Sequence, residues 1–148
     1  MNLKDQINSD IKDAMRAKDQ AALRALRSVK SAVLLAETDG SGREVDDSSV
    51  LKIIQKLVKQ RKESLELFEN ENRSDLAEKE KEELEVLEKY LPKAMDKEEL
   101  HQFLKNLVDE LNAESMKDMG RVMSEAQSRL AGRADGKEIS AIVRNLLA

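Results

Sequence analysis

Apolar residues recur at helical spacing along almost the whole chain, and this pattern constrains the fold more than any other feature. A repeat of three to four residues places the apolar side chains on one face of each helix. Before the single proline the pattern forms four segments, whose apolar positions begin with Leu3, Leu23, Val50 and Leu76. After it the pattern forms three segments, which begin with Leu100, Met119 and Ile139. The sequence therefore predicts an all-α protein.

The composition and the one proline give the same fold class and a domain boundary. Aromatic residues make up 2% of the chain of 148 residues, whereas β-sheets are enriched in aromatic and β-branched residues. Pro92 ends a helix, because a residue before proline is disfavoured in the α conformation. We predict an N-terminal four-helix domain over residues 1–92 and a small C-terminal three-helix domain over residues 93–148. Short polar residues that can cap helices are Asp46 or Asp47, Asp75, Asp96, Ser115 and Asp135.

Cysteine usage, hydropathy and net charge exclude several classes of protein. The chain has no cysteine, so disulfides and thiolate chemistry are excluded. No apolar run approaches the ~20 residues that span a bilayer, and the first residues lack an apolar leader segment. These features predict a soluble, cytoplasmic protein with no membrane partner. The net charge of -4 indicates that any contact with nucleic acid is local.

The residue types that carry catalysis or bind metals do not form a recognisable pattern. His101 is the only histidine, and Glu98 lies three residues before it. That spacing occurs in di-iron helical bundles, but such sites need a second histidine. No serine has a base in a known motif beside it, and the many glutamates of residues 78–88 fit the solvated face of a helix. We predict no catalytic residue, no metal and no cofactor.

The most informative stretch begins at Lys117 and contains two glycine-centred motifs. The first is Gly120-Arg121 within a helical pattern, and the second is Gly132-Arg133 at an expected turn between helices. Glycine within a helix costs ~1 kcal/mol relative to alanine, so we expect another backbone to lie against Gly120. The sequence favours a neighbouring helix over a nucleic-acid backbone as this partner, and we expect Gly120→Ala to destabilise the protein. Gly132 fits the left-handed position that ends a helix, and this turn would hold Arg133 outward, beside a helix N-terminus that can accept a phosphate.

This stretch resembles the tail of GatB, the tRNA-facing subunit of the glutamine-dependent aspartyl/glutamyl-tRNA amidotransferase. Those tails have a helix with Gly-x-x-Met, a Gly-Lys-Ala-Asn-Pro turn and a short final helix. The matching positions here are Gly120, Met123 and the turn Gly132-Arg133-Ala134-Asp135-Gly136. The resemblance implies an RNA-binding surface that includes Lys117, Gly120, Arg121, Gly132 and Arg133. Asp135-Gly136 replaces Asn-Pro of the GatB turn, and the loss of proline loosens the start of the last helix.

Over its full length the chain resembles the YqeY family. The segments that carry this resemblance are Ala14–Asp19, Arg61-x-Glu63-Ser64, Arg73-x-Asp75-Leu76, Glu80-x-x-Glu83 and Tyr90-Leu91-Pro92. The resemblance implies a helical domain followed by a GatB-tail-like domain, and a non-catalytic association with tRNA. The alternative is a helical adaptor that docks on a tRNA-modifying or translation protein. A third possibility is a true amidotransferase component, a carbon–nitrogen ligase with glutamine as amido donor, although the chain has no counterpart of the catalytic parts of that enzyme.

Overall fold

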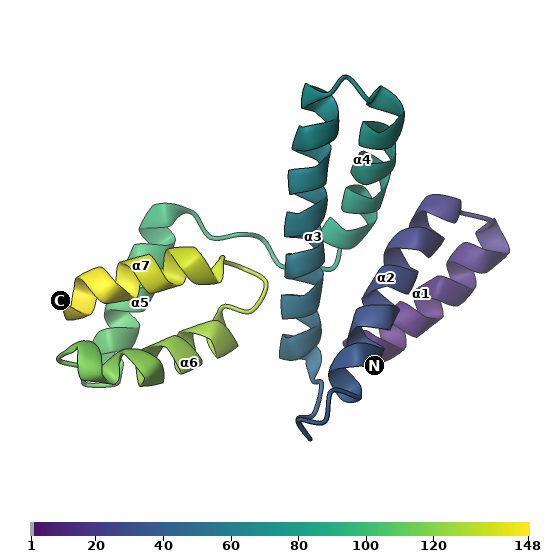
Figure 1. Ribbon diagram of the computed structural model, residues 1–148. Coiled ribbons are helices and arrows are strands. Elements are labelled where there is room, and N and C mark those ends of the chain that lie inside the picture. The colour runs from purple at the N-terminus through teal and green to yellow at the C-terminus, as the bar shows by residue number, and fades with distance from the viewer. Residues whose placement is uncertain (1) are drawn as a thin grey trace. The chain divides into compact units, whose positions relative to one another are not determined.

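The structure is a computed structural model that describes residues 2–148. Over this range it consists of helices joined by short connections and contains no β-strand (Figure 1). The prediction of an all-α protein is confirmed. In chain order the helices are α1 (Leu3–Ala17), α2 (Gln20–Glu37), α3 (Asp47–Asn70), α4 (Ser74–Glu88), α5 (Lys97–Glu110), the 3-10 turn η1 (Met116–Asp118), α6 (Met119–Arg129) and α7 (Gly136–Leu147).

Most of these helices begin at a short polar residue whose side chain accepts a backbone N–H of the first turn. The residues with this role are Asn2, Asp19, Asp46, Asp96, Ser115 and Asp135. Helices α4 and α6 differ, because they follow Arg73 and Asp118 without a side-chain cap. The predicted cap at Asp75 is wrong: its carboxylate accepts two hydrogen bonds of 3.3 Å from the Arg73 guanidinium instead.

The chain divides into two compact units, and each has an apolar core of its own. Unit 1 extends to Leu91, and unit 2 comprises Pro92–Ala148. The core of unit 1 draws side chains from α1 to α4, and the core of unit 2 draws them from α5 to α7. We propose that the two units are the domains expected at residues 1–92 and 93–148, because a separate core is what lets a segment fold as a domain.

Unit 1 is built from two helical hairpins. The pairs are α1 with α2 and α3 with α4, and each pair is joined by a short connection or a turn (Figure 1). Branched aliphatic side chains fill the space between the hairpins. The most buried of these are Leu26, Val29, Val50, Ile54 and Leu87. Their spacing of three and four residues is the pattern that predicted the helices.

A polar network crosses unit 1 beside this core. Arg61 of α3, whose side chain is 14% exposed, donates from Nη2 to Ser28 Oγ at 3.0 Å and to Glu83 Oε1 at 3.4 Å. Its Nη1 donates to the Leu57 carbonyl at 3.2 Å. Burial raises the pKa of the neighbouring Glu80 carboxyl, and the negative charge of Glu83 adds to this rise. Arg61 therefore ties α2, α3 and α4 together and supplies the positive charge that two close carboxylates need.

Tyr90 ties the end of α4 to α1. Its phenol Oη donates to Asp10 Oδ2 at 2.5 Å. Burial raises the pKa of Tyr90, and the hydrogen bond to Asp10 and the charge of that carboxylate raise it further. A phenol whose pKa is higher in the folded state than in the unfolded state stabilises the fold below the ordinary pKa near 10. This stabilisation is lost as the pH rises above that value.

We therefore expect Tyr90→Phe to lower the free energy of unfolding by about 1 kcal/mol at neutral pH, through the lost hydrogen bond. Above pH ~10 the wild-type protein should lose stability faster than the variant, so the difference between them should shrink. Chemical unfolding followed by circular dichroism at neutral and alkaline pH measures both effects. Tyr90 is the only tyrosine of the chain, so the variant removes the one phenol. A constant difference across this pH range would contradict the expected role of the phenol.

Unit 2 packs its three helices around a second aliphatic core. Its most buried side chains are Leu100, Leu104, Leu107, Val122, Ala126, Leu130, Ile139 and Val143. Arg129 of α6 adds a surface connection, because its guanidinium bonds Glu110 of α5 at 2.7 Å and Glu125 at 2.9 Å. The hydrogen bond that Arg129 donates to Glu110 lowers the pKa of that carboxyl, and the positive charge of Arg129 adds to this effect. The connection joins the last turn of α6 to the end of α5.

Candidate nucleic-acid interface

The five residues predicted to bind RNA lie at the two ends of α6. Lys117 is in η1, and Gly120 and Arg121 are in the first turn of α6. Gly132 and Arg133 follow the last turn. A helix of this length spans roughly 16 Å, at 1.5 Å per residue. The structure therefore brings the predicted residues together as two small groups rather than as one cluster.

Gly120 does not have the close neighbour that the sequence analysis expected. A Cβ atom at this position would meet nothing within 4 Å in the part of the chain that the structure describes, and the residue is exposed. The predicted packing role of Gly120 is therefore wrong. The expectation failed because a glycine within a helix gives no information about whether a second backbone is near. Open space at Gly120 leaves the helix surface accessible from outside unit 2.

Gly132 adopts the conformation that its sequence position suggested. Its φ angle is +78°, in the left-handed region that favours glycine. The residue is buried, and the next N–H, that of Arg133, donates to the Leu130 carbonyl at 2.9 Å. This arrangement ends α6 and reverses the chain before Asp135 caps α7. The position of Arg133 thus depends on a residue that can hold a positive φ.

Arg121 makes two contacts within unit 2. Its Nη1 donates to the Leu111 carbonyl at the end of α5 at 2.7 Å, and its Nη2 donates to Asp118 Oδ1 at 3.1 Å. The pKa of Asp118 is lowered by the bond from the Glu114 N–H and then by the bond from Arg121. Arg121 therefore closes the turn between α5 and α6. To bind a phosphate, its guanidinium must either use its remaining N–H groups or break these two hydrogen bonds.

Arg133 also turns back onto its own unit, which corrects the expectation that the turn holds it outward. Its Nε donates to the Lys93 carbonyl at 3.2 Å, and its own carbonyl accepts the Met95 N–H at 3.1 Å. The half-buried side chain keeps Nη1 and Nη2 for further hydrogen bonds. These contacts place Lys93 beside Arg133, and Lys137 follows in the first turn of α7. We name Lys93, Arg133 and Lys137 the basic corner.

The sequence pattern did not indicate that Lys93 and Lys137 belong to this group. Forty residues separate Lys93 from Arg133 in the chain, so no local pattern connects the two. The available signal was the position of Lys137 in the first turn of the last predicted helix. Lys117, at the other end of α6, is exposed and makes no ion pair among residues 2–148.

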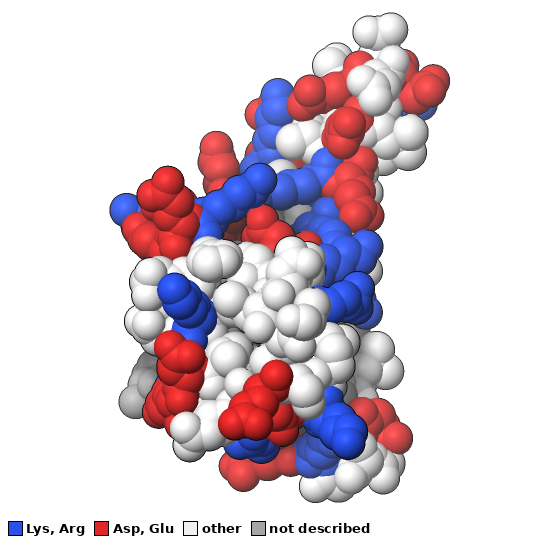
Figure 2. All heavy atoms as spheres, turned by 90° about the vertical axis from the view of Figure 1, so that its left-hand side faces the viewer, with Lys and Arg blue, Asp and Glu red and all other residues white. Residues whose placement is uncertain are grey.

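Charge and ligand geometry limit what the surface of the molecule can bind. Figure 2 shows Lys and Arg side chains lying among Asp and Glu side chains on the visible face. Across residues 2–148, no group of three or more His, Cys, Asp or Glu side chains is placed to hold a metal ion. His101 is exposed on α5. On this face a polyanion would meet a few cations at one place rather than a broad basic surface.

Comparison with known proteins gives the family. The model of the family described as Yqey-like protein matches residues 4–147. The chain belongs to the YqeY family. The full-length resemblance seen in the sequence is thereby confirmed, and the GatB-like features of unit 2 remain an expectation.

Several fungal proteins named "Altered inheritance of mitochondria protein 41, mitochondrial" are similar to this YqeY protein. The relative from Pyrenophora tritici-repentis is 32% identical over 136 residues, which is 90% of this chain and 74% of the relative. The relative from Lachancea thermotolerans is 38% identical over 57% of this chain and 46% of its own length. The relative from Saccharomyces cerevisiae (strain YJM789) is 34% identical over 74% of this chain and 60% of its own length.

These relatives contradict the prediction of a cytoplasmic protein, because their names place them in mitochondria. That prediction relied on the lack of cysteine and of an apolar leader. Neither feature excludes import into an organelle, since transit peptides are amphipathic rather than apolar. Between residues 2 and 148, no helix combines the length and the apolar character that crossing a bilayer requires.

Proposed function

We propose that this YqeY protein associates with tRNA without a catalytic step, and that unit 2 contacts the RNA backbone. The likeness of residues 93–148 to the GatB tail supports this proposal, because that tail helps to hold tRNA near its elbow. Amide transfer takes place in other domains and subunits of that enzyme, so the same likeness gives no support to amidotransferase activity here. Recognition through backbone and shape is the usual mode for structured RNA.

The basic corner is the observation that carries the proposal. The bond from Arg133 Nε to the Lys93 carbonyl brings the start of unit 2 to Arg133, and Lys137 follows four residues later in the first turn of α7. The N-terminus of α7 adds a partial positive charge. Asp135 offsets part of it, and its carboxylate already accepts the Lys137 N–H at 3.3 Å. Two or three phosphate contacts fit this surface, so we expect modest affinity.

A titration of tRNA at several salt concentrations tests the proposal. The logarithm of the binding constant should fall with the logarithm of salt by about 0.7 to 0.9 per phosphate contact. Arg133→Ala should remove about one contact and weaken binding to different tRNAs alike, because no base is read. The double variant Lys93→Gln/Lys137→Gln should weaken binding further, and neither lysine side chain supports the fold through a bond found within unit 2.

Lys105→Gln is the matched control, because it removes one exposed cation from α5, outside the basic corner. Melting curves of all variants separate lost binding from lost folding. Equal affinity in the control and in Arg133→Ala, or no salt-dependent binding of the wild-type protein, would overturn the proposal. A protein-binding adaptor would then be the better interpretation.

A further inference from the structure

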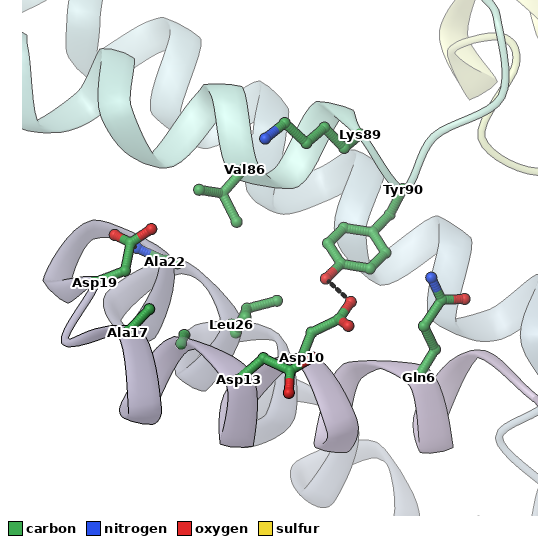
Figure 3. Close-up of a pocket in the computed structure, with 11 residues that line it drawn as sticks. Gln6, Asp10, Asp13, Ala17, Asp19, Ala22, Leu26, Val86, Lys89 and Tyr90 are labelled. Carbon is green, nitrogen blue, oxygen red and sulfur yellow. Dashed lines mark hydrogen bonds between the residues drawn. The ribbon is translucent and has the colours of Figure 1, made fainter.

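A groove in unit 1 lies on the side of α1 and α2 that faces the end of α4. It has a volume of about 480 Å³ and opens to solvent along one side (Figure 3). Its lining comes from α1, α2 and α4 and from the connections that follow α1 and α4. In the second connection Tyr90 reaches back to α1. Two of the segments that carry the YqeY resemblance contribute to it, residues 14–19 and residues 90–92. Neither unit 2 nor the basic corner takes part in this groove.

The floor of the groove is apolar, and most of its side chains are alanines. It contains Ala14, Ala17, Ala22, Leu26 and Val86. Lys18 ends α1 in the left-handed conformation, with a φ angle of +57°, and so sets α2 against α1 within a two-residue connection. The alanines on both helices leave room that larger side chains would occupy. A chain of methylene groups can lie on such a floor.

The rim of the groove carries three carboxylates. One oxygen of each forms a hydrogen bond or an ion pair within unit 1. Asp10 Oδ2 accepts from Tyr90, Asp19 Oδ1 accepts the Ala22 N–H at 3.1 Å, and Asp13 Oδ1 lies 3.6 Å from Arg16. In the described part of the chain the second oxygen of each carboxylate has no donor of its own. Lys89 on the α4 side is the one cation in the lining. The groove is therefore negative and retains acceptors for a donor from outside.

An apolar floor with an anionic rim matches an aliphatic stem that ends in a cation, which is the chemistry of lysine and arginine side chains. Pockets for small molecules enclose most of the ligand surface, whereas this groove is open along its length. An open groove suits one side of a larger partner. We propose that this groove docks a basic segment of a partner protein, which inserts a lysine or arginine side chain between α1 and the end of α4.

This proposal does not rest on tRNA association, and a titration with a model peptide tests it. The probe is an alanine-rich helical peptide with lysine at every fourth position, and its control is the same peptide with glutamine in place of lysine. Amide resonances of the full-length protein report the site. The lysine peptide should shift the N–H signals of Ala17, Ala22 and Tyr90, and the glutamine peptide should not.

The variant Asp10→Asn/Asp13→Asn/Asp19→Asn should weaken binding of the lysine peptide by about tenfold, since it removes three partly exposed ion pairs. It is designed to keep the fold, because asparagine can accept from Tyr90 and is as good an N-cap as aspartate. The matched control is Glu66→Gln/Glu71→Gln/Glu78→Gln, which removes three exposed negative charges elsewhere in unit 1. It should change the affinity less than about twofold.

Three outcomes would overturn the proposal. The first is the absence of shifts at the groove residues in the presence of the lysine peptide. The second is an equal loss of affinity in the two triple variants, which would show general attraction to an acidic protein. The third is tighter binding of a free polyamine, such as spermidine, than of the peptide. That result would assign the groove to a small cation.

Discussion

Arg61→Ala is expected to lower the free energy of unfolding by about 2 to 3 kcal/mol, because it leaves a largely buried carboxylate without its counter-charge. The Arg61 and Glu83 side chains are each 14% exposed, and their 3.4 Å contact lies beside the core of unit 1. The substitution also removes the donor to Ser28 Oγ and the positive charge that lowers the pKa of Glu80. Helices α2, α3 and α4 then lose the side chain that connects them.

The pH dependence gives this prediction a second measurement. The pKa of Glu80 is already raised, so its carboxyl favours the fold when it is protonated, and that contribution is lost as the pH rises. Without Arg61 this pKa should rise further. The difference in stability between the wild-type protein and Arg61→Ala should therefore be larger at pH ~7 than at pH ~4. Urea unfolding at both values measures it.

Arg73→Ala provides the control for Arg61→Ala. Arg73 also pairs with a carboxylate, Asp75, but the two side chains are 56% and 66% exposed. Water replaces such a pair at little cost, so this variant should unfold almost as the wild-type protein does. Equal losses in the two arginine variants would show that burial does not determine the effect. A pH-independent loss in Arg61→Ala would assign it to packing rather than to charge.

The same substitution at two glycines of unit 2 is expected to have opposite effects. Gly132→Ala should destabilise the protein by about 1 to 2 kcal/mol, because a residue with a Cβ is strained at a φ of +78°. Gly120→Ala should stabilise it by about 0.5 kcal/mol, because alanine favours the helix and its Cβ would meet open space. Each variant serves as the control of the other.

Thermal unfolding of the two variants measures both signs. Gly132→Ala should also displace Arg133 from the Lys93 carbonyl, since the chain reversal at Gly132 positions that side chain. Weaker tRNA binding by Gly132→Ala at a temperature where the variant is folded would support the proposed role of the basic corner. A lower melting temperature for Gly120→Ala would show a close contact at α6, and a higher one for Gly132→Ala would show that the turn does not need glycine.

The amino-acid sequence alone determined the helices and most of their starts. Helical spacing of apolar residues is a local property, and so are N-caps such as Asp46, Asp96 and Asp135, whose partners lie two or three residues away. Gly132 was predictable for the same reason, because the end of a helix needs a particular backbone angle. The failed cap at Asp75 shows the limit of local rules, since Arg73 competes for the same carboxylate.

Only the tertiary structure decided what the candidate side chains contact. Arg121 donates to a carbonyl ten residues away in the chain, and Arg133 donates to one forty residues away. Tyr90 donates to Asp10, which lies eighty residues away in the chain. A cationic side chain pairs with the acceptor that helix packing brings within about 3 Å. The spacing of apolar residues along the chain does not predict which acceptor that is. The open space at Gly120 and the groove beside Ala14 likewise depend on which helix faces are covered, which packing of the cores determines.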